Sequence, residues 1–270
     1  MQKILQTFKF FIYLMFLFSF HNSVKASEED EKALKISTDA YNYDKGFGDF
    51  ISNQTMTLRN KQGEETIRYF RGKTLEVTND GDKTLFIFDS PKDVKGTATL
   101  TFTYKTGPDD QWLYLPALKR VKRISSSNRT GKFVSSEFSY EDLSTDEPED
   151  YTFTWLEDGP CLTEASLTCH LIEATPKNKK SGYSKRIIYV DTDELLYQSV
   201  KFYNRRGDLE KELHFKGYQK YLDKFWRADT LEMTNLQTGK STVIAWENYQ
   251  FQTNLSLNDF RPEKLARMAR

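Results

Sequence analysis

The sequence predicts a single domain of mainly β structure, arranged as an antiparallel meander with a few helices. Short segments in which apolar and polar residues alternate recur along the chain, and Gly, Pro, Asn and Asp separate them. Aromatic residues, which favour strands, are frequent, with 20 Phe, 15 Tyr and 4 Trp. No linker rich in Pro, Gly or Ser interrupts the chain. We therefore expect one domain over residues 27–270.

The first 26 residues have the pattern of a secretory signal peptide. Lys3 and Lys9 form a positive start, residues 10–20 are almost wholly apolar, and the small residue Ala26 ends the segment. The apolar run is shorter than the ~20 residues that a membrane-spanning helix needs, so an uncleaved anchor is the weaker alternative. We expect cleavage near Ala26, no lipid on the mature N-terminus, and a periplasmic protein.

The charge balance argues against a nucleic-acid partner. The chain carries 39 basic and 39 acidic side chains, and residues 1–26 account for three of the bases and none of the acids. Nucleic-acid binding needs a concentrated basic face, which this balance does not supply. A local cluster remains at Lys119, Arg120, Lys122, Arg123 and Arg129. It is either a solvated turn or a surface for a lipid phosphate or an acidic partner.

A helix is predicted over residues 28–41. Apolar residues recur there at near-helical spacing, and acidic residues occupy the first turn, where the helix dipole favours them. Gly46 and Gly48 then break the chain. A second, short helix is predicted at residues 257–266, where Pro262 lies near the start.

Strands are predicted over most of the chain between these helices. Five precede the basic cluster, at residues 50–59, 66–77, 83–89, 97–104 and 111–115. Seven follow it, at residues 151–155, 169–175, 183–190, 197–203, 211–218, 225–235 and 241–249. The sequence Asn79-Asp-Gly81 indicates a hairpin turn.

Residues 97–104 alternate most regularly. Four threonines (97, 99, 101 and 103) point to one side, which we expect to face water. Ala98, Leu100, Phe102 and Tyr104 point to the other side, which we expect to be apolar.

A family signature lies between Trp112 and Leu143. It reads WLYLPALKRVKRI over residues 112–124 and EFSYEDL over residues 137–143. This pattern resembles the central signature of the outer-membrane lipoprotein-sorting family, which is related to the LolA and LolB periplasmic lipoprotein carriers. The resemblance covers most of the exported chain. The signature positions are Leu115, Pro116, Arg120, Arg123, Phe138, Ser139, Glu141, Asp142 and Leu143.

The resemblance implies an incomplete antiparallel β-barrel with an N-terminal helix, covering helices and an apolar cavity for acyl chains. The inward side of each strand outside residues 97–104 is an assumption, because a slip of one residue reverses the face. A filled sandwich core is the alternative interpretation. The candidate cavity residues are Phe86, Phe88, Leu100, Phe102, Tyr104, Trp112, Tyr114, Phe153 and Trp155.

Cys161 and Cys169 are predicted to form a disulfide, the simplest role for one close pair in an oxidising compartment. A metal site that also uses His170 would lack a ligand, and adjacent side chains on a strand point apart, so we expect no metal.

The sequence favours a protein that is not an enzyme and needs no cofactor. It contains no Gly-x-Ser-x-Gly, His-Glu-x-x-His, phosphate-loop or dinucleotide motif. Glu137, Glu141 and Asp142 form an acidic trio that suits acid–base catalysis, but we expect them either to act as caps or to pair with the bases at 119–129.

The leading hypothesis is a monomeric periplasmic carrier of lipid or lipoprotein acyl chains in outer-membrane lipoprotein sorting, with an inner-membrane transporter as a further partner. The second is an accessory protein of an RND-type lipid exporter, and a hydrolase is the third.

Overall fold

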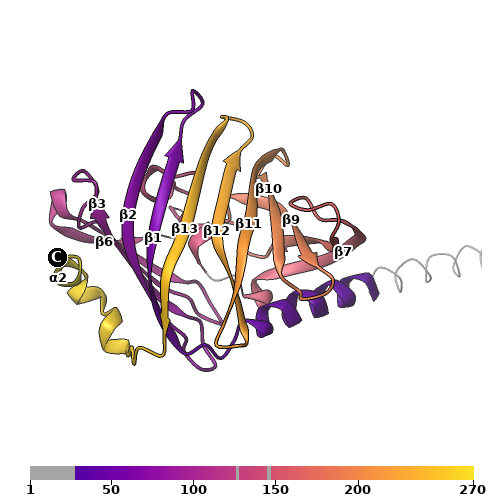
Figure 1. Cartoon of the computed structure of the whole chain (residues 1–270), viewed down its shortest axis with the longest axis horizontal. Helices are drawn as coiled ribbons and strands as arrows, with labels where there is room; N and C mark the ends of the chain where they lie inside the picture. The colour runs from indigo at the N-terminus through magenta and orange to yellow at the C-terminus, as the bar shows by residue number, and fades with distance from the viewer. Residues whose placement is uncertain (1–27, 126–127, 145–146) are drawn as a thin grey trace, which may run out of the picture.

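The computed structural model describes residues 28–125, 128–144 and 147–270 (Figure 1). The predicted signal peptide (residues 1–26) and its cleavage point beside Ser27 lie outside the described residues. Among the residues that are described, no helix has both the length and the apolar character to span a membrane.

Thirteen strands of the described chain form one open, antiparallel sheet. They are β1 (Asp49–Arg59), β2 (Glu65–Leu75), β3 (Lys83–Ser90), β4 (Ala98–Phe102), β5 (Asp110–Leu115), β6 (Arg120–Ile124), β7 (Tyr151–Pro160), β8 (Thr168–Pro176), β9 (Tyr183–Asp191), β10 (Tyr197–Asn204), β11 (Leu209–Tyr221), β12 (Phe225–Asn235) and β13 (Lys240–Phe251).

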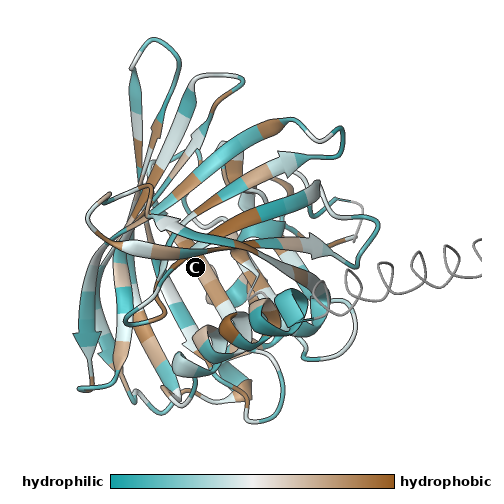
Figure 2. Ribbon diagram, turned by 90° about the vertical axis from the view of Figure 1, so that its right-hand side faces the viewer, coloured by the Kyte–Doolittle hydropathy of each residue, from teal (hydrophilic) through white to brown (hydrophobic). Residues whose placement is uncertain are grey.

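The sheet consists of two meanders joined by one seam. Strands β1 to β6 run in order from the middle of the sheet to one edge, and β7 to β13 run from the other edge back to the middle. At the seam β1 pairs with β13, so that Met56 lies opposite Ile244. The sheet is curved (Figure 2), and the strands at its two edges, β6 and β7, follow one another in the chain.

Both faces of the sheet carry a hydrophobic core, as the alternation within β3 shows. Phe88 packs in a core with Met56, Phe133 and Phe138, and we call this side the inner face. Leu85 and Ile87 point to the opposite side, the outer face, and pack in a second core. Since successive side chains of a strand point to opposite faces, the part of β3 between the two cores must be apolar on both sides, as its sequence LFIF over residues 85–88 is.

The C-terminal segment covers the outer face of β3 to β5. It consists of 3-10 turns at Leu257–Phe260 and Pro262–Lys264 and the short helix α2 (Leu265–Met268). Phe260 and Leu265 are fully buried against Leu100 and its neighbours. A capping box between Ser256 and Asp259 fixes the start of the segment. The predicted terminal helix is confirmed in a shorter form.

Residues 28–43 are helical, in agreement with the predicted first helix. Figure 2 shows this helix, which continues from the grey trace, lying across the strands. Its Ala33 and Ala40 pack against Phe153, Ile172 and Val190 of β7, β8 and β9. These contacts are on the inner face, because pairing aligns one row of side chains across six strands: Trp155, Ile172, Ile188, Val200, Leu213 and Met233.

The twelve predicted strands are confirmed, but one strand was missed. Residues 120–124, interpreted as a turn, form the edge strand β6 and pair with β5. Four of these five residues are exposed, and this polarity gave no strand signal. The connection between β2 and β3 is also longer than the tight hairpin predicted from Asn79-Asp-Gly81, since it spans residues 76–82.

The predicted disulfide is present between Cys161 and Cys169, which are eight residues apart. It joins the end of β7 to the start of β8, and it packs on the outer face against Ile187 and Tyr189 of β9.

Candidate functional site

The inner face presents a broad apolar surface. Strands β1 to β3 and β9 to β13 all contribute to it. Its centre is closed, but some apolar side chains around the centre are only partly buried, including Phe86, Phe215, Leu231 and Trp246. The apolar surface therefore extends beyond the part that is fully covered.

One irregular stretch, residues 132–143, covers the centre of the inner face, and we call it the closing segment. Phe133 and Phe138 are each 1% exposed. The ring of Phe133 lies 5.7 Å from that of Phe88 and 5.7 Å from that of Tyr140. The segment contains only two short 3-10 turns, Phe133–Ser135 and Glu141–Leu143. It is held by side chains and not by a regular element.

The backbone of the closing segment is strained at its tip. Val134 has φ 44° and Ser135 has φ 62°, a left-handed conformation that is unfavourable for a β-branched residue such as valine. The Arg68 guanidinium of β2 donates a hydrogen bond to the Val134 carbonyl oxygen. Burial lowers the pKa of Arg68, although Asp93 opposes that shift.

A buried ion pair anchors the C-terminal end of the segment. Lys211 Nζ on β11 lies 3.1 Å from Asp142 Oδ2, and their side chains are 7% and 1% exposed. The Tyr183 hydroxyl donates a 2.7 Å hydrogen bond to Asp142 Oδ1. Burial acts to raise the pKa of Asp142. The charges of Lys211 and Arg186, with hydrogen bonds from the Ser139 amide and the Tyr183 hydroxyl, outweigh burial and lower this pKa. Burial and the Asp142 charge raise the pKa of Tyr183.

A second anchor holds the middle of the segment to the seam of the sheet. The Glu137 amide donates a 2.9 Å hydrogen bond to Thr242 Oγ1 on β13. Lys211 Nζ also donates to the Glu137 carbonyl oxygen, at 3.2 Å. Lys211 therefore joins both anchors.

The acidic trio does not pair with the bases at 119–129, but Asp142 and Glu141 accept hydrogen bonds from the backbone amides of Ser139 and Gly182, as the alternative of capping implied. Asp142 pairs with Lys211, Glu137 pairs with Lys132 at 2.6 Å, and Glu141 accepts from Ser181 Oγ and the Gly182 amide. Local sequence could not identify Lys211, Ser181 or Gly182 as partners, because β11 and the β8–β9 turn approach the segment only in the fold; Lys132, in contrast, is a near neighbour of Glu137 in the chain. The trio has a structural role in the closing segment.

The basic cluster is divided between two environments. Arg129 is mostly buried and pairs with Asp109 at 2.6 Å. Arg123 pairs with Asp110 at the start of the neighbouring strand β5. Lys119, Arg120 and Lys122 are exposed around the start of β6. Leu115 ends β5, and Pro116 begins the 3-10 turn Pro116–Leu118 that leads into β6.

The candidate cavity residues do not share one face. Phe86 and Phe88 lie on the inner face beside the closing segment. Phe153 and Trp155 also lie there, but beneath the N-terminal helix, where Lys32 Nζ sits 3.7 Å from the centre of the Trp155 ring.

The predicted orientation of residues 97–104 is wrong. Leu100, Phe102, Trp112 and Tyr114 belong to the outer core under the C-terminal segment. Tyr104 lies just beyond β4, and the Lys83 ammonium contacts both its ring and that of Phe102.

The four threonines lie on the inner side and are buried, with exposures between 2% and 8%. At Thr101 the cover includes Gln111, whose Nε2 contacts Thr101 Oγ1 and also donates to the Tyr140 carbonyl oxygen of the closing segment. The polar side of this regularly alternating strand is therefore buried and does not face water.

His170 takes no part in this site. Its Nδ1 lies 2.5 Å from Asp158 Oδ1, and the neighbouring cysteine is in the disulfide. A polar groove of about 360 Å³ borders the closing segment near Tyr183 and Lys211. Solvent can therefore approach the anchors from this side.

Comparisons with known proteins agree with this architecture. A family model described as "Uncharacterized protein" matches residues 80–267. The chain is similar to a solved outer membrane lipoprotein-sorting protein domain from Vibrio parahaemolyticus, with 48% sequence identity and a TM-score of 0.84; the match covers 88% of this chain and 99% of that one. No curated protein matches the chain.

Two further solved structures share the fold. A DUF1329 family protein from Desulfovibrio piger is 28% identical with a TM-score of 0.81, over 88% of this chain and 99% of that chain. A LolA superfamily protein from Nitrosomonas europaea is 17% identical with a TM-score of 0.67, over 85% and 97% of the two chains. The latter likeness concerns the fold alone.

Proposed function

The chain belongs to the outer membrane lipoprotein-sorting protein family, as its signature predicted, and from this premise we propose that it carries lipid or lipoprotein acyl chains on its inner face. The observation that carries the proposal is the broad apolar inner surface, whose centre is covered by the closing segment and whose margins remain partly exposed. A sheet that only needed a core would leave fewer large apolar side chains half-buried beside an irregular cover.

The closing segment is the part of the molecule that gives way to cargo. Its Phe133 and Phe138 occupy apolar space that an acyl chain would take. Each methylene buried there contributes about 0.8 kcal/mol. When the segment moves away from the sheet, its Asp142 and Glu137 lose their contacts with Lys211 and Thr242 and become accessible to water. The free energy gained from the buried methylenes offsets the loss of these contacts. The role requires binding and release but no bond chemistry.

The same proposal sets the cellular context. The chain is exported by a signal peptide over residues 1–26 that is cleaved near Ala26, and residues 27–270 act as one monomeric domain in the periplasm. An inner-membrane transporter hands cargo to it. If the protein is instead an accessory of a lipid exporter, it contacts that transporter without carrying lipid.

Lipid recovery and probe uptake test the carrier role. Mass spectrometry of lipid extracted from the purified mature protein should recover lipid in stoichiometric amount. After delipidation, the protein should take up a dansyl-labelled fatty acid with a rise in fluorescence. A wild-type protein that is isolated empty and takes up no probe would contradict the carrier role and support the accessory role.

A matched pair of variants locates the binding face. Leu231 lies on the inner face, whereas Thr230 beside it points to the outer face. Leu231→Trp should weaken uptake about tenfold, because the added ring fills space that an acyl chain needs. Thr230→Trp should retain wild-type uptake. Equal uptake by both variants would exclude the inner face as the site.

A further inference from the structure

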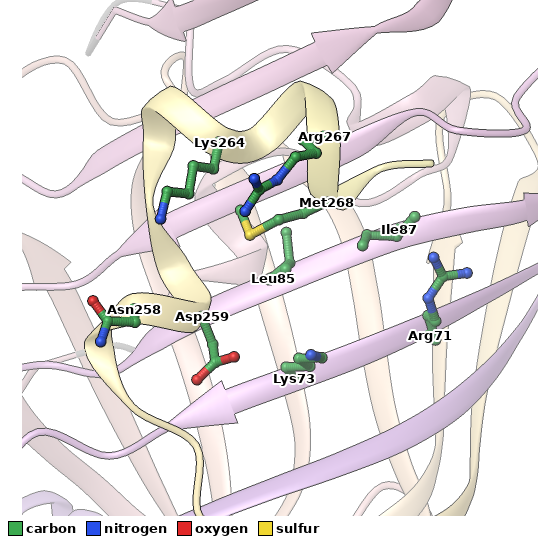
Figure 3. Close-up of a pocket in the computed structure, with 9 residues that line it drawn as sticks. All are labelled: Arg71, Lys73, Leu85, Ile87, Asn258, Asp259, Lys264, Arg267 and Met268. Carbon is green, nitrogen blue, oxygen red and sulfur yellow. The ribbon is translucent and has the colours of Figure 1, made fainter.

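A separate cavity lies on the outer face, between the C-terminal segment and strands β2 and β3. It has a volume of about 330 Å³. Figure 3 shows Arg71 and Lys73 on β2 and the segment crossing above them. The sheet itself separates this cavity from the inner face, because Leu85 and Ile87 in its wall alternate with Phe86 and Phe88 on the other side.

The lining of this cavity is strongly cationic. Four bases from two distant parts of the chain meet there: Arg71 and Lys73 from β2, and Lys264 and Arg267 from the C-terminal segment. Asp259 is the one acidic residue in the lining. Bases that converge from separate elements repel one another, so the empty cavity favours an anion.

The acidic side chains at the cavity are already engaged. Asp259 Oδ2 accepts hydrogen bonds from the Ser256 amide at 2.9 Å and the Ser256 hydroxyl at 3.0 Å. These bonds lower the pKa of Asp259, and Lys73 adds to the effect. Asp89 pairs with Arg71. Within the described chain, Lys73, Lys264 and Arg267 make no ion pair closer than 4.0 Å.

The wall between these cations is apolar. Leu85 and Ile87 are 2% and 4% exposed, and Met268 is partly buried. A bare ion would use only the cations. A phosphate ester with a short carbon skeleton would use both parts of the lining, since its oxygens bind the bases and its carbons contact the wall. Arginine suits this role because its planar fork matches phosphate oxygens.

We propose that the cavity formed by Arg71, Lys73, Lys264 and Arg267 over Leu85, Ile87 and Met268 binds a phosphate ester, of the kind found in a phospholipid head group or as a free phosphate compound. This site goes beyond the carrier role and does not depend on it. Its occupancy fastens the C-terminal segment to β2.

Calorimetric titration of the delipidated mature protein tests the site with three probes: inorganic phosphate, glycerophosphoglycerol and dihexanoyl phosphatidylglycerol. The first two lack acyl chains, so they do not report on the inner face. We expect binding of the two phosphate esters, weakened at high salt because the cations are partly exposed. Inorganic phosphate that binds as tightly as glycerophosphoglycerol contradicts recognition of an ester. Tighter binding of the lipid assigns the site to a head group only where Lys73→Gln with Lys264→Gln abolishes the gain, and equal binding of the two esters assigns it to free phosphate compounds.

Two double variants provide the control. Lys73→Gln with Lys264→Gln should weaken glycerophosphoglycerol binding at least about tenfold, since each lysine is a charged phosphate contact. Lys119→Gln with Lys122→Gln removes the same charge from the exposed region around β6 and should preserve binding. The first variant should keep wild-type uptake of the dansyl fatty acid, which reports on the inner face. Absence of binding of all three probes to the wild type, or an equal loss in both variants, overturns the proposal.

Discussion

Lys211 and Asp142 form an ion pair in which the two side chains are 7% and 1% exposed, with 3.1 Å between Nζ and Oδ2. The pair connects β11 to the closing segment across a separation of 69 residues. Because both charges are almost wholly removed from bulk water, each depends on the other.

Removal of one partner should therefore destabilise the protein strongly. We expect Lys211→Met to lower the free energy of unfolding by about 3–5 kcal/mol, because it leaves the Asp142 carboxylate buried without its cation. Urea denaturation measures this change. Glu232→Gln, which breaks the more exposed Lys216–Glu232 pair, is the control and should cost less than about 1 kcal/mol. Similar losses in the two variants would contradict the role of the buried pair.

The assignment of Leu100 to the outer core predicts a loss of stability without a loss of cargo. Leu100 is 0% exposed and packs near Phe260 and Leu265. Leu100→Ala should lower the free energy of unfolding by about 2–5 kcal/mol. The folded variant should still take up the dansyl fatty acid as the wild type does. Selective loss of uptake with unchanged stability would place Leu100 at the cargo site instead.

Asp82 predicts a pH dependence of stability. Burial raises its pKa from 3.8 to about 6, with Lys45 opposing the shift and Glu76 and Glu147 adding to it. The folded protein therefore holds a proton that the unfolded chain releases near pH 4. Protonation of Asp82 therefore contributes to the free energy of unfolding. The contribution is complete below pH 3.8, is lost as the pH rises through about 6, and amounts to at most about 3 kcal/mol.

Urea midpoints between pH 4 and pH 7 measure the effect of Asp82. Asp82→Asn should remove this part of the decline, whereas Asp193→Asn, at an exposed position, should keep the wild-type slope. Identical slopes in all three proteins would exclude Asp82 as the source.

The Cys161–Cys169 disulfide should add modest stability and no function. Closure of such a short loop in the unfolded chain contributes roughly 2–3 kcal/mol in the loop-entropy description. The double variant Cys161→Ser, Cys169→Ser should therefore unfold at lower urea, yet take up fatty acid normally, since the bridge lies on the outer face. Alkylation of the native protein should modify neither cysteine before reduction. Free thiols in protein purified from its native compartment would contradict this prediction.

The sequence was sufficient for the elements but not for the faces. Alternation located β4, yet its threonine face proved to be buried, with Gln111 linking Thr101 to the closing segment. Alternation separates the two sides of a strand but does not say what covers each side. Where both sides are covered, the more polar one looks like a solvated surface. Strand β6 was missed for a related reason, because its exposed bases have the composition of a turn.

The signature identified the closing segment but not what holds it. Phe138 and Asp142 were selected from the local pattern, and both are central to the segment. Lys211, Tyr183 and Thr242 were not selected, because each is an ordinary strand residue in its own neighbourhood. Only the fold brings them to the segment, so no local signal could have found them. The cationic cavity shares this property, since Lys73 and Lys264 are brought together by the C-terminal segment.

The seam between β1 and β13 also governs the order in which the molecule can form. The first meander, β1 to β6, is made early, but the partner of β1 lies near the end of the chain, at Lys240–Phe251. The segment that covers the outer face of β3 to β5 comes later still. Closure of so long a loop is entropically costly and slow. A chain that emerges N-terminus first therefore leaves β1 without its second partner, and the outer face of β3 to β5 without its cover, until β13 and the segment after it have been made.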